Sequence, residues 1–258
     1  MTMISATYPL ERVAESRSAT TIESRPWGVW ATLGWFAGAA VTWLAVSFLC
    51  GFGYALWMTM AHPGVAIDFE SPILAYLSGA LAMPGGALLL LLAARWAGPT
   101  AFGYVGLTRP VMRHFLIGLG LLVAVWCLAE VFFWMFPAFD QSSDLIREYR
   151  AALGNRSALV LFWLELAVTA PVFEEIIFRG FLMRGLSASR LGVVGALLLS
   201  SLVFAAAHVQ YNLPTMAMVF GLGLVFGLMR WRSGSTTVSI MLHATWNTAC
   251  GLMCAWYA

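Results

Sequence analysis

Long apolar stretches separated by short polar ones dominate the chain. Each stretch is close to the ~20 residues that an α-helix needs to cross the hydrocarbon core of a bilayer. Apolar and polar residues do not alternate with a period of two, which argues against a membrane β-barrel. We therefore predict an all-α fold, a polytopic transmembrane helix bundle of about seven helices (six to eight). The predicted spans are residues 28–57, 73–97, 114–137, 157–182, 191–209, 213–230 and 236–256.

Two of the polar connections between these segments carry structural predictions. Residues 138–156 form the longest one and are predicted to contain a short amphipathic helix on the membrane surface. The turn at 211–214 is short, so the fifth and sixth segments should be antiparallel neighbours.

Composition supports the membrane assignment and narrows the partners. Of the residues, 61% are hydrophobic and 10% charged, whereas a soluble domain carries about 25% charged residues. The net charge is only +2, and no basic cluster with interleaved aromatic residues occurs, so no nucleic-acid partner is expected. The expected partners are membrane lipids and a membrane-associated peptide or protein substrate. The four cysteines lie in or beside apolar runs and show no disulfide or zinc pattern.

The distribution of arginine predicts the orientation, because basic residues concentrate in cytoplasmic connections. All 14 basic residues are arginine, and with seven alternating helices eleven of them fall on one side. The other three, Arg147, Arg150 and Arg156, stand among acidic residues on the opposite side. We expect a multi-pass protein of the cell (plasma) membrane with a cytoplasmic N-terminus. Residues 1–27 form a polar tail without a secretory apolar region, so the first apolar helix should act as its own insertion signal.

Two adjacent carboxylates occur inside the fourth segment, at Glu174 and Glu175. Ionisable groups at membrane depth cost at least ~2.5 kcal/mol each on insertion, so they point to a function. Glu175 and Arg179 are four residues apart and share a helical face, where they can form an ion pair. Glu174 then remains free for chemistry, unless the cluster only packs helices together. Pro171 predicts either the first turn of a helix, whose positive end would help to keep Glu174 ionised, or a kink.

Two further polar pairs lie on the fifth and seventh segments. His208 follows Phe204 by four residues, and Asn247 follows His243 by four. Alone, each pair also suits a helix cap or interhelical hydrogen bonds. Together with Glu174 they form a set that can activate water and stabilise an oxyanion. Zinc is chemically possible, since one Glu and two His leave one position open, but the HExxH signature is absent and no metal is demanded.

These motifs, Glu174-Glu175-x-x-x-Arg179, Phe204-x-x-x-His208 and His243-x-x-x-Asn247, resemble in order those of the CPBP family. That family comprises CAAX prenyl proteases and bacteriocin-processing, or abortive-infection, intramembrane proteins, and the resemblance covers roughly residues 160–250.

The resemblance implies an intramembrane endopeptidase of the glutamate type. It implies Glu174 as general base, supported by Glu175 and Arg179. His208 would help to activate the water, and His243 and Asn247 would hold the oxyanion. If the enzyme depends on a metal, the implied cofactor is Zn²⁺, held by Glu174, His208 and His243. We accordingly divide the chain into a polar cytoplasmic tail (1–27), N-terminal transmembrane helices (28–156) and a catalytic transmembrane core (157–258).

Two other functions remain open from the sequence. One is a non-catalytic membrane scaffold or bacteriocin immunity protein of the same family. The other is a transporter that uses Glu130, Glu165 and Glu174 as a proton relay, although no internal repeat supports it. On a straight helix Glu165 is half a turn out of phase with Glu174 and would face away from the site. Simple topology also places His208 nearer the outer surface than Glu174, so either the fifth segment is shifted or the fourth bends at Pro171.

Overall fold

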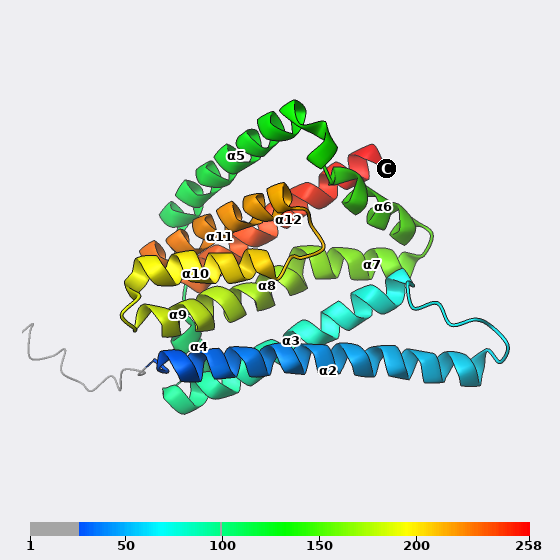
Figure 1. Cartoon of the computed structure of the whole chain (residues 1–258), viewed down its shortest axis with the longest axis horizontal. Helices are drawn as coiled ribbons and strands as arrows, with labels where there is room; N and C mark the ends of the chain where they lie inside the picture. Colours follow the sequence, from blue (N-terminus) through cyan, green and yellow to red (C-terminus); the bar gives the residue numbers. More distant parts are fainter. Residues whose placement is uncertain (1–25, 99) are drawn as a thin grey trace, which may run out of the picture.

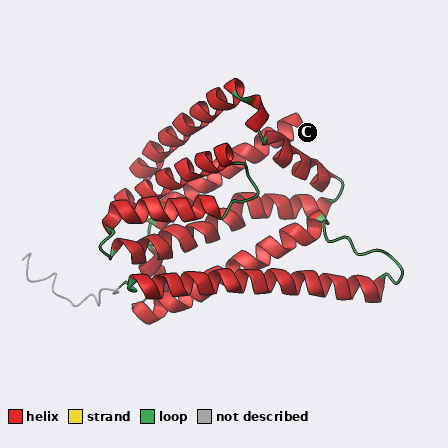
Figure 2. Ribbon diagram, viewed as in Figure 1, coloured by secondary structure: helices red, strands yellow, loops and turns green. Residues whose placement is uncertain are grey.

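All seven predicted segments are helical in the computed structural model, which describes residues 26–98 and 100–258. The predicted tail therefore lies almost entirely outside the described residues. Within the described ranges the fold is all-α and has no strand (Figure 2). The helices are α2 (Val29–Ala61), α3 (Pro72–Ala97), α5 (Met112–Met135), a composite helix over 156–187, α10 (Gly192–Ala206), α11 (Leu213–Ser233) and α12 (Thr236–Tyr257).

The helices run back and forth along the long axis of the molecule (Figure 1). Four of them, α2, α3, α5 and α11, are long and apolar enough to cross a membrane, and α10 is a shorter apolar helix. The start of α2, the connection from α3 to α5 and the turn from α11 to α12 lie at one end of the bundle. Helix α10 packs against α11, as the short turn between them predicts. The protein is thus a polytopic helical membrane protein.

The connections carry three short elements, α4 (Ala101–Val105), the 3₁₀ turn η1 (Pro137–Phe139) and α6 (Ser142–Leu153). The amphipathic helix predicted within 138–156 is α6, which buries Tyr149 and Ala152 on its inner face. Helix α4 was not predicted, because five residues are too few to show a helical period. It is fixed instead by its ends: the Thr100 hydroxyl accepts a hydrogen bond from the Gly103 amide, and Gly106 ends the helix at φ 71°.

The composite helix contains two π-helical segments. In chain order it comprises α7 (Arg156–Leu164), the π-helix η2 (Glu165–Thr169), α8 (Ala170–Glu175), the π-helix η3 (Ile176–Leu182) and α9 (Met183–Ser187).

Pro171 neither starts a new helix nor breaks this one. A proline inside a helix cannot donate to the carbonyl four residues earlier, and its ring clashes with that carbonyl. The wider turn of η2, immediately before Pro171, accommodates this loss. The helix therefore continues through Pro171, so the first of the two predicted alternatives, a helix start with its favourable field at Glu174, is absent.

Glycine permits one of the closest contacts of this helix, between Gly180 and Val105. A Cβ atom at Gly180 would lie 2.9 Å from the Val105 Cβ and 3.0 Å from its carbonyl oxygen. We expect Gly180→Ala to destabilise the protein by about 1–3 kcal/mol, the usual cost of overpacking a core. Gly221→Ala is the matched control, since nothing lies within 4 Å of a Cβ at that position. Thermal unfolding in detergent measures both, and equal melting temperatures for the two variants would refute this packing.

Candidate active site

The carboxylate of Glu175 is held in a buried ion pair. Arg179 Nη1 lies 2.7 Å from Glu175 Oε1, and both side chains are fully buried. Arg179 Nη2 also donates to the carbonyl oxygen of Gly223, at 3.2 Å. The guanidinium carbon lies 4.2 Å from the ring centre of Phe204 and 5.4 Å from that of Phe226. The ion pair expected from the four-residue spacing is therefore present, inside an aromatic cage.

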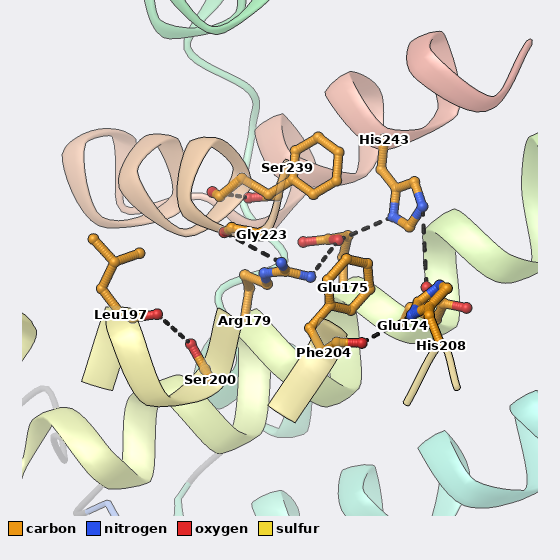
Figure 3. A network of polar contacts seen from close by, with 11 residues as sticks. Glu174, Glu175, Arg179, Leu197, Ser200, Phe204, His208, Gly223, Ser239 and His243 are labelled. Atoms are coloured by element: carbon orange, nitrogen blue, oxygen red, sulfur yellow. Dashed lines mark hydrogen bonds and ion pairs between the residues drawn. The ribbon is translucent and has the colours of Figure 1, made fainter. Parts of the chain in front are cut away.

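His243 on α12 links this ion pair to the second carboxylate (Figure 3). Its Nδ1 lies 3.0 Å from Glu175 Oε1. A carboxylate oxygen accepts hydrogen bonds, so we assign the proton to Nδ1. The other ring nitrogen, Nε2, lies 4.0 Å from Glu174 Oε2. Because the ring also stacks on Phe226, at 4.9 Å and 19°, its Nε2 is fixed in direction.

Glu174 differs from its neighbour in what it contacts. Its side chain is 16% exposed, and its Oε2 has no hydrogen-bond partner among the described residues. It lines a cavity, whereas Glu175 faces the ion pair. Of the two adjacent carboxylates, Glu174 is therefore the one that a bound molecule can reach.

His208 lies just beyond the C-terminal end of α10. Its Nδ1 is 2.8 Å from the carbonyl oxygen of Phe204, which accepts and so places the proton on Nδ1. The ring packs against Phe204 and stacks with Tyr211, at 4.8 and 6.0 Å between ring centres. His208 lines the same cavity as Glu174 and His243. The predicted topology places His208 at a different membrane depth from Glu174. In the structure, Glu174, His208 and His243 nevertheless line one cavity.

Asn247 is anchored to the π-helical segment η2. Its Nδ2 donates to the carbonyl oxygen of Leu166, at 2.9 Å. A π-helical turn disturbs the regular pairing of backbone carbonyls, and this bond supplies one of them with a donor. Asn247 also lines the cavity. Since the amide group has two N–H bonds, one remains for another acceptor.

The cavity has a volume of about 870 Å³ and lies between α3, α5, α6, α11, α12 and the composite helix. Apolar side chains form much of its wall, among them Trp126, Phe133 and Met218. It extends to exposed residues at the end of the bundle that carries α6, including Glu70 and Asp140. The six predicted site residues are thus gathered around one cavity, four lining it and the Glu175–Arg179 pair lying behind them.

The sequence interpretation was wrong about Glu165, which lines this cavity together with Glu174. A straight helix would place the two carboxylates on opposite faces. The intervening π-helix η2 changes the phase between them. Pro171 was the available signal, since a proline inside an apolar helix commonly marks such a distortion.

The residues proposed for zinc do not fit a metal site as the structure places them. Among residues 26–98 and 100–258 no three His, Cys, Asp or Glu side chains lie close enough to hold a metal ion.

Part of the chain is similar to known proteins. Residues 156–249 match the family model described as "Type II CAAX prenyl endopeptidase Rce1-like". An "Uncharacterized 24.3 kDa protein" of Escherichia coli is 38% identical over 88 residues, which are 33% of this chain and 40% of that protein. No solved structure matches significantly. All six candidate residues lie inside the matched range, which is the part of the chain that is similar to type II CAAX prenyl endopeptidases.

Proposed function

We propose that this protein is an intramembrane endopeptidase that hydrolyses a membrane-associated peptide or protein with a water molecule activated by Glu174. The observation that carries the proposal is the Glu174 carboxylate, which lines a cavity beside His243 Nε2 and has an oxygen without a hydrogen-bond partner among the described residues. Two hydrogen-bond acceptors 4.0 Å apart can both receive a hydrogen bond from one water molecule placed between them.

The reaction then proceeds in two steps. Glu174 removes a proton from the water while the water oxygen forms a bond to the carbonyl carbon of the substrate. When the tetrahedral intermediate collapses, the C–N bond breaks and Glu174 delivers that proton to the leaving nitrogen. The products are a new carboxyl terminus and a new amino terminus, and Glu174 returns to its ionised form.

The negative charge on the carbonyl oxygen needs donors during the attack. The second N–H of Asn247 is one, held in place because the first is bonded to Leu166. His243 positions the water instead, because its Nε2 accepts a hydrogen bond from the water while its Nδ1 donates to Glu175. His208, fixed by its bond to the Phe204 carbonyl, orients the water.

The orientation of the bundle decides from which side a substrate enters. The cavity reaches the end that carries α6, opposite the end where most arginines lie. With the N-terminus cytoplasmic in the plasma membrane, the cavity opens to the outside. A reporter fused after Ala258 should therefore be active only outside the cytoplasm. Activity of that fusion only inside the cytoplasm would reverse both the topology and the side of entry.

The proposed activity is tested by comparing membrane peptides from cells that carry the wild type, Glu174→Ala or His208→Ala. We expect the same cleavage products to disappear in both variants at unchanged expression and melting temperature. Mass spectrometry of the peptides identifies the products and, with them, a substrate. If both variants keep every product and the phenotype of the wild type, the polar residues only hold the helices together, as in a scaffold or immunity protein.

A further inference from the structure

Glu165 is another carboxylate that lines the cavity, and the proposed reaction does not use it. It lies on η2, nine residues before Glu174, and the π-helical turn brings both side chains to the same cavity. Its Oε2 is buried and has no hydrogen-bond partner among the described residues. A buried polar atom without a partner is destabilising, and more so if it is charged. A bound molecule that supplies a donor would remove this destabilisation.

The neighbouring helix makes room for this carboxylate. Gly79 on α3 faces it, and a Cβ atom at that position would overlap Glu165 Oε1. No cation in the described part of the chain forms an ion pair with it. Arg147 also lines the cavity, but it pairs with Asp144 at 2.8 Å and is exposed. The structure therefore leaves space for the Glu165 side chain, and no cation of the described residues balances its charge.

The spacing along the helix locates Glu165 relative to the reaction. Nine residues at a rise of about 1.5 Å separate it from Glu174 by roughly 13 Å along the axis. An extended peptide covers about 3.3 Å per residue, so it spans this distance in about four residues. Because one cavity contains both carboxylates, a peptide with its scissile bond at Glu174 can lay a side chain against Glu165.

We propose that Glu165 is a specificity-determining residue that binds a basic side chain, Lys or Arg, about four residues from the scissile bond. This inference rests on the proposed protease function, but it concerns binding rather than chemistry. A charge-assisted hydrogen bond from an ammonium or guanidinium group would satisfy the unpartnered oxygen and balance the charge of the carboxylate.

The test uses palmitoylated, dye-labelled 14-residue peptides of alanine and leucine in which a single Lys occupies each position in turn. Binding is measured by fluorescence anisotropy to the full chain carrying Glu174→Gln, reconstituted in nanodiscs, so that no cleavage interferes. We expect one or two adjacent positions at which Lys binds about tenfold more tightly than Gln, equivalent to ~1.4 kcal/mol. A Glu at the same position should bind most weakly.

Adding Glu165→Gln should abolish this preference and let the Glu peptide bind as well as the Gln peptide. Glu130→Gln is the matched control: it changes another glutamate that lines the cavity, on α5, and should keep the preference at that position. The inference fails if no peptide binds, if the position of Lys has no effect, or if the preference survives Glu165→Gln.

Cleavage by the wild type separates this inference from the proposed function. Peptides that are cut without regard to Lys would overturn the role of Glu165 and leave the protease intact. A Lys preference that depends on Glu165, with no cleavage of any peptide by the wild type, would overturn the protease and leave the binding subsite.

Discussion

Glu174→Gln is expected to lower the rate of peptide cleavage by about 10²–10⁴-fold, the usual contribution of a general base. The amide keeps the size of the side chain but cannot take a proton from water. Since Oε2 of Glu174 has no hydrogen-bond partner to lose within residues 26–98 and 100–258, the melting temperature should stay close to that of the wild type. Single-turnover cleavage by purified protein in liposomes, with a peptide identified from cells, measures the rate.

The adjacent glutamate supplies the comparison for this prediction. Glu175 Oε1 accepts from both Arg179 and His243, so Glu175→Gln should lower the melting temperature as well as the rate. A Glu174→Gln enzyme with unchanged kcat, or two variants that lose the same amount of stability, would show that the two carboxylates have been assigned the wrong roles.

Arg179→Leu is expected to destabilise the protein by about 3–5 kcal/mol, because it leaves the Glu175 carboxylate buried without its cation. The guanidinium is fully buried and also bonds to the Gly223 carbonyl, so no water can replace it without rearrangement. Urea or thermal unfolding in mild detergent measures the change.

The double variant Glu175→Leu/Arg179→Leu distinguishes an ion pair from simple packing. Removing both charges together is often neutral or stabilising when the volume is kept, so much of the lost stability should return. Activity should not return, because His243 would lose the carboxylate that fixes its Nδ1. Additive losses in the two single variants and the double variant would contradict the pairing.

Both histidines line the cavity with their proton on Nδ1, but the two Nδ1–H groups donate to different acceptors. His243 donates through Nδ1 to a side-chain carboxylate, and His208 through Nδ1 to the backbone carbonyl of Phe204. In each case Nε2 is left without a protein hydrogen bond in the described part of the chain. Such anchoring holds a ring in one tautomer and one orientation, which suits residues that must position a water molecule.

Much of this arrangement could be predicted because the length of an apolar run and the spacing of charged residues can both be read within one segment of the chain. The seven helical segments follow from runs of apolar residues, and α6 follows from the polar stretch between two of them. The Glu175–Arg179 pair follows from the four-residue period of a helix. The gathering of three motifs around one cavity was implied by the family resemblance, not by any local pattern.

The features that could not be predicted depend on contacts between distant segments. The π-helix η2 arises where Pro171 removes a donor and Asn247, on another helix, bonds to the Leu166 carbonyl. Without that information Glu165 was placed on the wrong face. The space that Gly79 leaves for Glu165 is likewise a contact between two helices, and no periodicity along one helix reveals it.

The most direct test of the central claim is cleavage of an identified peptide by the purified full chain in liposomes made with H₂¹⁸O. Wild-type protein should release a fragment whose new carboxyl terminus carries one ¹⁸O atom, and Glu174→Gln at the same concentration should release almost none. Purified wild type that cleaves nothing, or a Glu174→Gln variant that forms the labelled fragment at the wild-type rate, would contradict hydrolysis by a Glu174-activated water.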